Sequence, residues 1–168
     1  MNRKTLFRGM ALGLVGLLWV WAGPAAAQTV RAVMSVEVKF LDPHSTTADI
    51  TQVHGYMVYD TLFSLDTKGQ PQPQMVVTYQ ISPDTLTYTF TLRDGLKWHD
   101  GKPVRAADAV ASIKRWAVKD AAGQKLMART GSFEATGEKT FILKPKEPYG
   151  LTIRALAKEY SYVPLIIP

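Results

Sequence analysis

The chain of 168 residues contains no cysteine and only three histidines. The lack of cysteine excludes disulfides, thiolate metal sites, iron–sulfur clusters, a cysteine nucleophile and a lipid-modified N-terminal cysteine. His44, His54 and His99 include no pair at the i, i+4 spacing that would place two metal ligands on one helical face. Hydrophobic residues make up 46% and charged residues 20%, which is typical of a globular protein. The length favours one domain.

Recognisable catalytic motifs are also missing. The chain has no Gly-x-Ser-x-Gly nucleophile elbow. The segment from Gly95 to Pro103 resembles a phosphate loop only loosely. Five residues separate Gly95 from Gly101, one more than in that motif, and Pro103 replaces the hydroxyl residue that would hold Mg²⁺. His99 and Asp100 are a candidate acid–base pair, but adjacent side chains of an extended segment point to opposite faces. We therefore expect no enzyme activity, no metal and no cofactor.

The first 27 residues have the pattern of a secretory signal. Basic residues up to Arg8 precede an uncharged apolar run of 14 residues, Met10–Gly23, and Ala25-Ala26-Ala27 follows as a cleavage site. This run is short for a bilayer span, which needs about 20 residues. We predict cleavage after Ala27 and a periplasmic location.

The net charge of +6 falls when this signal is removed. The remaining chain has 17 cations and 14 acids, a net charge of +3, without a block of Lys and Arg. Such a weak basic excess gives little support to nucleic-acid binding.

Apolar alternation predicts several strands in the rest of the chain. In the clearest one, Leu86, Tyr88, Phe90 and Leu92 alternate with threonines. We expect strands over 29–40, 62–65, 76–81, 85–92, 133–136 and 140–143, with hairpins joining the third to the fourth and the fifth to the sixth.

Three helices are predicted by spacing. The predicted ranges are 52–61, 105–118 and 148–158. The first helix has an apolar stripe of Val53, Tyr56 and Met57 that continues to Asp60. The second helix has an apolar stripe made up of Ala106, Val110, Ile113 and Ala117. Arg105 stands where a capping hydroxyl is usual, so we expect Asp108 to compensate in part through the helix dipole.

The end of the chain, 164–168, is an apolar run, whereas chain termini are usually polar and frayed. We expect that the sequence is interrupted within a fold.

Several motifs together resemble one protein family. They are Leu41-Asp42-Pro43, Tyr59–Phe63, Ser82-Pro83-Asp84 and the block YTFTLRDGLKWHDGKP, Tyr88–Pro103. This ordered set resembles the family 5 extracytoplasmic solute-binding proteins, which are the peptide, oligopeptide and nickel receptors of ABC importers. The resemblance covers most of residues 30–168. The block itself is best explained as scaffold, because its Asp-Gly pairs suit turns and Trp98 is expected to pack between the hairpin and the next helix.

The resemblance implies an α/β fold, namely the N-terminal fragment of a two-lobed periplasmic-binding-protein-like fold of class II type that includes a small inserted α+β domain. On this basis 1–27 is the signal peptide, 28–44 begins the first lobe, 45–160 forms the inserted domain and 161–168 returns toward the first lobe, where the sequence is truncated.

Ligand-binding candidates lie where the chain crosses between these domains, the usual place for a cleft. The loop 45–49 and the segment 159–162 are the two crossings. The candidate residues are Thr46, Thr47, Asp49, Tyr160 and Ser161.

The resemblance implies a monomeric periplasmic receptor that captures a peptide or similar small solute and delivers it to ABC permease subunits in the inner membrane. Two alternatives stay open at this point. A secreted hydrolase domain would need a nucleophile with its base, or a metal cluster, and neither is visible. A non-functional fragment would expose hydrophobic surface meant for a missing lobe.

Overall fold

The computed structural model describes Val33 and residues 36–168. The predicted signal peptide and most of the predicted strand over 29–40 lie outside the described residues. Within the described part, no helix is long and apolar enough to cross a membrane.

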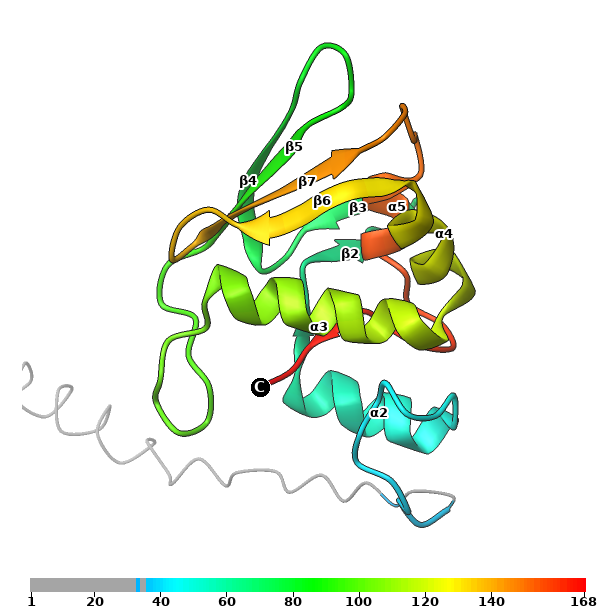
Figure 1. Ribbon diagram of the computed structural model, residues 1–168. Helices are drawn as coiled ribbons and strands as arrows, with labels where there is room; N and C mark the ends of the chain where they lie inside the picture. Colours follow the sequence, from blue (N-terminus) through cyan, green and yellow to red (C-terminus); the bar gives the residue numbers. More distant parts are fainter. Residues whose placement is uncertain (1–32, 34–35) are drawn as a thin grey trace, which may run out of the picture. The chain divides into compact units, whose positions relative to one another are not determined.

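The main element of the fold is a four-stranded antiparallel sheet with the order β4-β5-β7-β6 (Figure 1). Its strands are β4 (Val76–Ile81), β5 (Tyr88–Leu92), β6 (Thr130–Ala135) and β7 (Thr140–Pro145). Both predicted hairpins are therefore confirmed, β4 with the predicted bounds. Phe90 on β5 is opposite Phe141 on β7, and their rings stack with centroids 5.0 Å apart.

Burial along β5 follows the predicted alternation of apolar residues and threonines. Tyr88, Phe90 and Leu92 are buried, whereas the threonines between them are half-buried. Phe63 meets the Phe90 ring edge-on at 5.9 Å, so the aromatic cluster joins the sheet to the preceding segment. Such edge-on and offset aromatic pairs are favourable beyond the area that they bury.

Helix α3 (Ala106–Lys119) packs against β6 and β7. All four residues of its predicted stripe are buried, and so is Trp116. At the start of the helix, Asp108 accepts a hydrogen bond from the Arg105 backbone N–H at 2.8 Å, and the Ala106 N–H donates to the Glu138 carbonyl at 2.7 Å. Asp108 thus compensates for the missing capping hydroxyl through a hydrogen bond, and not only through the helix dipole.

Helix α4 (Ala121–Arg129) follows α3 after one residue and was not predicted. Asp120 ends α3 and caps α4, because its carboxylate accepts hydrogen bonds from the N–H groups of Ala122 and Gly123 at 2.9 Å. A Cβ at Gly123 would lie 2.7 Å from the Ala117 Cα, so only glycine permits this close contact between the two helices.

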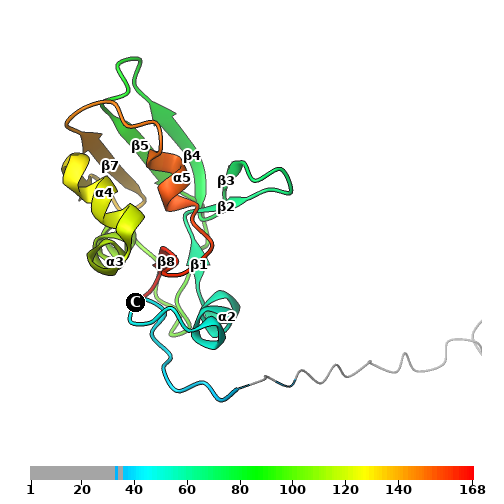
Figure 2. The same ribbon diagram turned by 90° about the vertical axis from the view of Figure 1, so that its right-hand side faces the viewer.

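Two short strand pairs complete the sheet structure. β2 (Phe63–Leu65) and β3 (Pro71–Pro73) form a hairpin around the turn at 66–70. β1 (Asp60–Thr61) pairs with β8 (Leu165–Ile166), which belongs to the apolar run near residue 168 (Figure 2). The run is therefore built into the fold beside β1.

Helix α2 (Asp49–Val58) confirms a predicted helix but corrects its bounds and its buried face. The predicted stripe is wrong, because Val53, Tyr56 and Met57 are exposed, Met57 to 79%. The buried residues are Thr51, Gln52 and Gly55.

Polar contacts with the preceding loop explain this orientation of α2. The Thr51 hydroxyl donates to the Phe40 carbonyl at 2.8 Å, and the Gln52 amide donates to the carbonyls of Pro43 and Thr46. A Cβ at Gly55 would lie only 3.1 Å from the Pro43 ring. The helix therefore packs through its small and polar face.

Two further predictions need correction. Residues 36–40, the described part of the predicted strand over 29–40, form no strand and have no paired strand within the described residues. Helix α5 (Thr152–Leu156) is much shorter than the predicted 148–158. It begins late because the Thr152 hydroxyl and N–H both donate to the Tyr149 carbonyl, which closes a turn in front of the helix.

Candidate functional site

The first predicted ligand segment is the loop that leads into α2. Thr46 is half-buried, and its hydroxyl accepts a hydrogen bond from the Ala48 N–H at 3.2 Å. Thr47 is exposed, and so is Asp49, the first residue of α2. Thr46 thus supports the loop, whereas Thr47 and Asp49 present their side chains to solvent.

The second predicted segment, 159–162, is held by Lys158. The Lys158 Nζ donates to the carbonyls of Tyr160 and Tyr162 and forms an ion pair with the buried Asp120 at 2.7 Å. Tyr160 is 75% exposed, and Ser161 has a φ of 62°, in the left-handed region that non-glycine residues rarely occupy. This segment therefore has a fixed backbone, and its residues 159–161 are exposed, whereas Tyr162 packs against the core.

The second segment, 159–162, borders two different hollows. Tyr160 and Tyr56 line one of about 240 Å³, where the Tyr56 hydroxyl donates to the Glu159 carbonyl at 3.1 Å. Burial, with Glu159 nearby, raises the pKa of Tyr56 to about 12, so this hydroxyl stays a donor at neutral pH. Ser161 lines a separate hollow of about 620 Å³. Neither hollow includes Thr46, Thr47 or Asp49, so the joint role of the five candidate residues stays a prediction.

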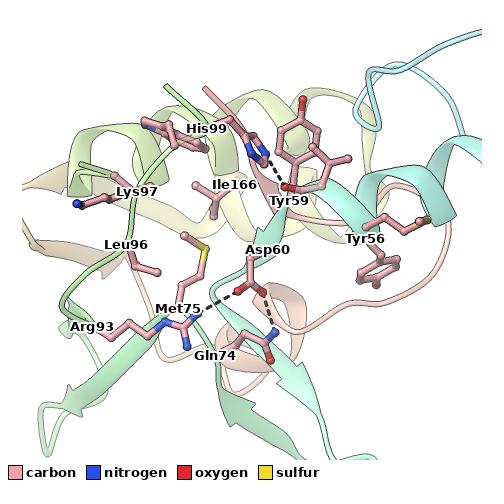
Figure 3. A pocket seen from close by; sticks show the side chains of 14 residues that line it. Tyr56, Tyr59, Asp60, Gln74, Met75, Arg93, Leu96, Lys97, His99 and Ile166 are labelled. Carbon is pink, nitrogen blue, oxygen red and sulfur yellow. Dashed lines mark hydrogen bonds and ion pairs between the residues drawn. The ribbon is translucent and has the colours of Figure 1, made fainter. Parts of the chain in front are cut away.

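A third hollow, of about 430 Å³, lies between the end of α2, β1 and the loop after β5 (Figure 3). Asp60 is its central polar group: the carboxylate accepts hydrogen bonds from Gln74 Nε2 at 2.7 Å and from Arg93 Nη2 at 3.3 Å. Sequence reasoning placed Asp60 on a helical stripe and missed this cluster, because its three members are far apart in the chain.

The loop 93–103, which contributes to this hollow, has the predicted scaffold character. Gly95 and Gly101 have φ values of +78° and +84°, and Trp98 packs against the core. His99 lies 3.3 Å from the Val58 carbonyl, whereas Asp100 pairs with Lys102, which lowers the pKa of that carboxyl. His99 and Asp100 are thus engaged with different partners.

The residues before α2 are anchored to α3 by an ion pair. Arg115 donates two hydrogen bonds to the Asp42 carboxylate, at 2.6 and 3.0 Å. Burial is the largest single influence and opposes ionisation of Asp42, but the hydrogen bonds from Arg115 and from the His44 N–H, together with the Arg115 charge, outweigh it and lower the pKa of Asp42. Such a bidentate pair fixes geometry as well as charge.

His44, next to this pair, is 2% exposed, and neither ring nitrogen has a hydrogen-bond partner within the described residues. Burial lowers the pKa of His44 to about 4, and the nearby Arg115 charge acts in the same direction. The imidazole is therefore neutral at pH 7. Among the described residues, no group of three potential metal ligands comes together.

The hollows offer hydrogen-bond donors, carboxylates and aromatic rings, which are the groups of a binding protein for polar solutes. Comparison with known proteins identifies the protein family. The chain belongs to the bacterial extracellular solute-binding proteins, family 5: the model of the family's middle region matches residues 70–167. This is a family of solute-binding proteins and not of enzymes, so the hydrolase alternative is set aside.

Two curated relatives are similar over nearly the whole chain. The "probable peptide ABC transporter periplasmic-binding protein y4tO" of Sinorhizobium fredii is 45% identical over 167 residues, which are 96% of this chain and 31% of the relative. The glutathione-binding protein GsiB of Escherichia coli K12 is 30% identical and covers 88% of this chain and 29% of the relative. The chain thus spans less than a third of the length of these relatives.

The fold is shared with solved structures. Haemophilus influenzae OppA, in complex with the peptide RPPGFSPFR, matches with a TM-score of 0.62 and 23% identity, over 76% of this chain and 28% of that one. At this identity the likeness shows the fold alone. The chain is therefore a mixed α/β portion of the family fold.

Proposed function

We propose that this chain is part of the periplasmic substrate-binding component of an ABC importer, which captures a peptide or similar small solute and delivers it to a membrane permease. One observation carries the proposal: the 45% identity to a relative named as a peptide ABC transporter periplasmic-binding protein, over 96% of this chain. A solute receptor of this kind closes on its ligand by hinge motion between lobes.

The proposal includes a division of the chain. A cleaved signal peptide at 1–27 sends the protein to the periplasm, where it acts as a monomer. Residues 28–44 begin the first lobe, 45–160 form a small inserted domain and 161–168 return toward the first lobe. A hollow lined by Leu41, Asp42 and Pro43 together with Ile167 and Pro168 supports a returning segment, because it brings the residues after β8 beside 28–44.

Within this scheme, Thr46, Thr47, Asp49, Tyr160 and Ser161 face the solute. Support comes from the exposed side chain of Tyr160 on a backbone that Lys158 holds in place. An exposed aromatic ring with a polar end offers both apolar contact and a hydrogen bond to a peptide.

Calorimetric titration of the complete protein, as the cell produces it, with a panel of short peptides and glutathione tests the proposal. We expect at least one peptide to bind, and the double variant Thr47→Val/Tyr160→Ala to weaken that binding by about tenfold or more. Thr67→Val, in the exposed turn between β2 and β3, is the control and leaves the affinity unchanged. Unchanged affinity in the double variant rejects the proposed residues, and absence of binding to any small solute rejects the function.

A further inference from the structure

The hollow of about 620 Å³ beside the start of α4, which Ser161 also lines, contains lysines that the proposed solute contacts do not use. Its walls come from the end of α3, the first turns of α4, the turn before α5 and the segment 158–162. The residues that matter here are Lys119, Lys125, Lys158, Tyr149, Leu151 and Tyr162. We call this hollow the lysine groove.

The lysine groove has an excess of positive charge. Three of its lining residues are lysines, and its one acid is Asp120. Asp120 is buried and already neutralised by Lys158 at 2.7 Å. Lys119 and Lys125 are exposed and form no ion pair within the described residues. Two cations therefore face solvent without a countercharge from the groove itself.

The wall of the groove between these cations is apolar and aromatic. Leu151 is 57% exposed, unusual for a leucine in an ordered turn, and Tyr149 and Tyr162 are half-buried beside it. Arg129 lies over the Tyr149 ring, with its Cζ 5.0 Å from the ring centroid, and this contact fixes the ring. An exposed leucine and aromatic rings near exposed cations offer a protein partner both apolar contact and charge.

We propose that the lysine groove binds an acidic peptide segment of a partner protein. Carboxylates of the segment pair with Lys119 and Lys125, and an apolar side chain between them packs on Leu151 and the tyrosine rings. Charge complementarity of this kind steers association and fixes the orientation of the partner. Only the identity of the partner rests on the proposed function, under which the partner is the membrane permease.

The test uses the complete protein and a rhodamine-labelled peptide, Asp-Leu-Glu-Asp-Leu-Glu, followed by fluorescence anisotropy. We expect Lys119→Glu/Lys125→Glu to weaken binding by about tenfold or more, and Leu151→Ser to weaken it by a smaller factor. The matched control, Lys68→Glu/Lys144→Glu, makes the same charge change at exposed lysines outside the groove and leaves the affinity unchanged. Raising salt from about 0.05 to about 0.5 M weakens wild-type binding, because these charges are exposed.

Equal losses in both double variants would overturn the proposal, since they would reflect net charge alone. Binding of the amide peptide Asn-Leu-Gln-Asn-Leu-Gln with the same affinity would also overturn it. So would groove-dependent binding to phosphatidylglycerol vesicles without binding to the acidic peptide, because this would identify a lipid surface. Solute titration separates the two proposals, although Ser161 lines the same groove. We expect Ser161→Ala to weaken solute binding, whereas Lys119→Glu/Lys125→Glu, at residues that the solute proposal does not use, should weaken binding of the acidic peptide and leave the solute affinity as in the wild type.

Discussion

Two regions of the molecule are held together in different ways. In the sheet module, formed by β4–β7 with α3 and α4, aromatic and aliphatic side chains such as Phe90, Phe141 and Trp116 are completely buried. In the α2 region, residues 36–58, the buried side chains are mostly polar or small, whereas Phe40 and Met57 are exposed. The sheet module is thus stabilised by its apolar core, and the α2 region by hydrogen bonds and the ion pair to Arg115.

Because of this difference, the stability of the two regions should respond differently to the removal of a side chain. Removing a side chain from a packed core costs the transfer energy and leaves a cavity. Removing an exposed apolar side chain leaves no cavity. The exposed apolar surface of the α2 region is instead available for contact with other protein, and under the proposed function the remainder of the first lobe would cover it.

The largest expected effect is in the sheet module. Phe90→Ala should lower the free energy of unfolding by about 3–5 kcal/mol, because Phe90 is completely buried between Phe63 and Phe141. Urea denaturation measures this change. Thr89→Ala, the neighbour on the other face of β5, is the control, and a similar loss in that variant would mean that strand propensity and not core packing is responsible.

The next effect is a pH dependence due to His44. Its pKa is about 4 in the folded protein and 6.5 when unfolded, so the unfolded state binds more protons between these values. Stability is therefore complete above pH 6.5 and falls as the pH drops toward 4, by about 3 kcal/mol at most. The groups that face the ring are Asp42 and Arg115.

Denaturation at a series of pH values tests this dependence. His44→Leu should flatten the curve between pH 4 and 6.5, because it removes the group that titrates in this range. His99→Gln, at an exposed histidine, should leave the curve as in the wild type. A curve that is equally steep in His44→Leu would assign the dependence to other groups.

A smaller effect is expected from the ion pair that anchors the α2 region. Arg115→Ala should cost about 1 kcal/mol or less, since both side chains are more than a third exposed. Hydrogen exchange should show faster opening of residues 41–48, with little change in the sheet module. Lys114→Ala, at the adjacent exposed position, is the control and should not affect either region. Faster exchange throughout the sheet module would contradict a local role.

The smallest effect is expected on the exposed face of α2. Met57→Ala should change stability by less than about 0.5 kcal/mol, although the same side chain truncated in a core would cost several times more. Urea denaturation of a protein that consists of residues 36–168 measures this change in stability. A loss of 2 kcal/mol or more, as expected for a core methionine, would show that Met57 is covered after all and would remove the contrast between the two regions.

Sequence reasoning succeeded where burial follows a local period. The stripe of α3 from Ala106 to Ala117 and the alternation of β5 are both found in the structure, because one face of each element meets the same core. It failed for α2, where the buried face is determined by hydrogen bonds from Thr51 and Gln52 to the preceding loop. Apolar periodicity contains no information on such contacts.

The missed features depend on non-local or unusual signals. Helix α4 has only two large apolar residues, Leu126 and Met127, and its main sequence signals are the cap at Asp120 and the small residue Gly123. The cluster around Asp60 joins Gln74 and Arg93 from separate segments, so no spacing reveals it. The motif block 88–103 identified the family correctly, although in the structure its residues mainly form strand and turns.

Native mass spectrometry of the protein purified separately from the periplasmic and cytoplasmic fractions of its host tests the central claim most directly. The account predicts a protein whose first residue is Gln28 and which retains a bound peptide or similar small solute that is released on denaturation. A protein that keeps Met1, is found in the cytoplasmic fraction and carries no solute would contradict both export and solute capture.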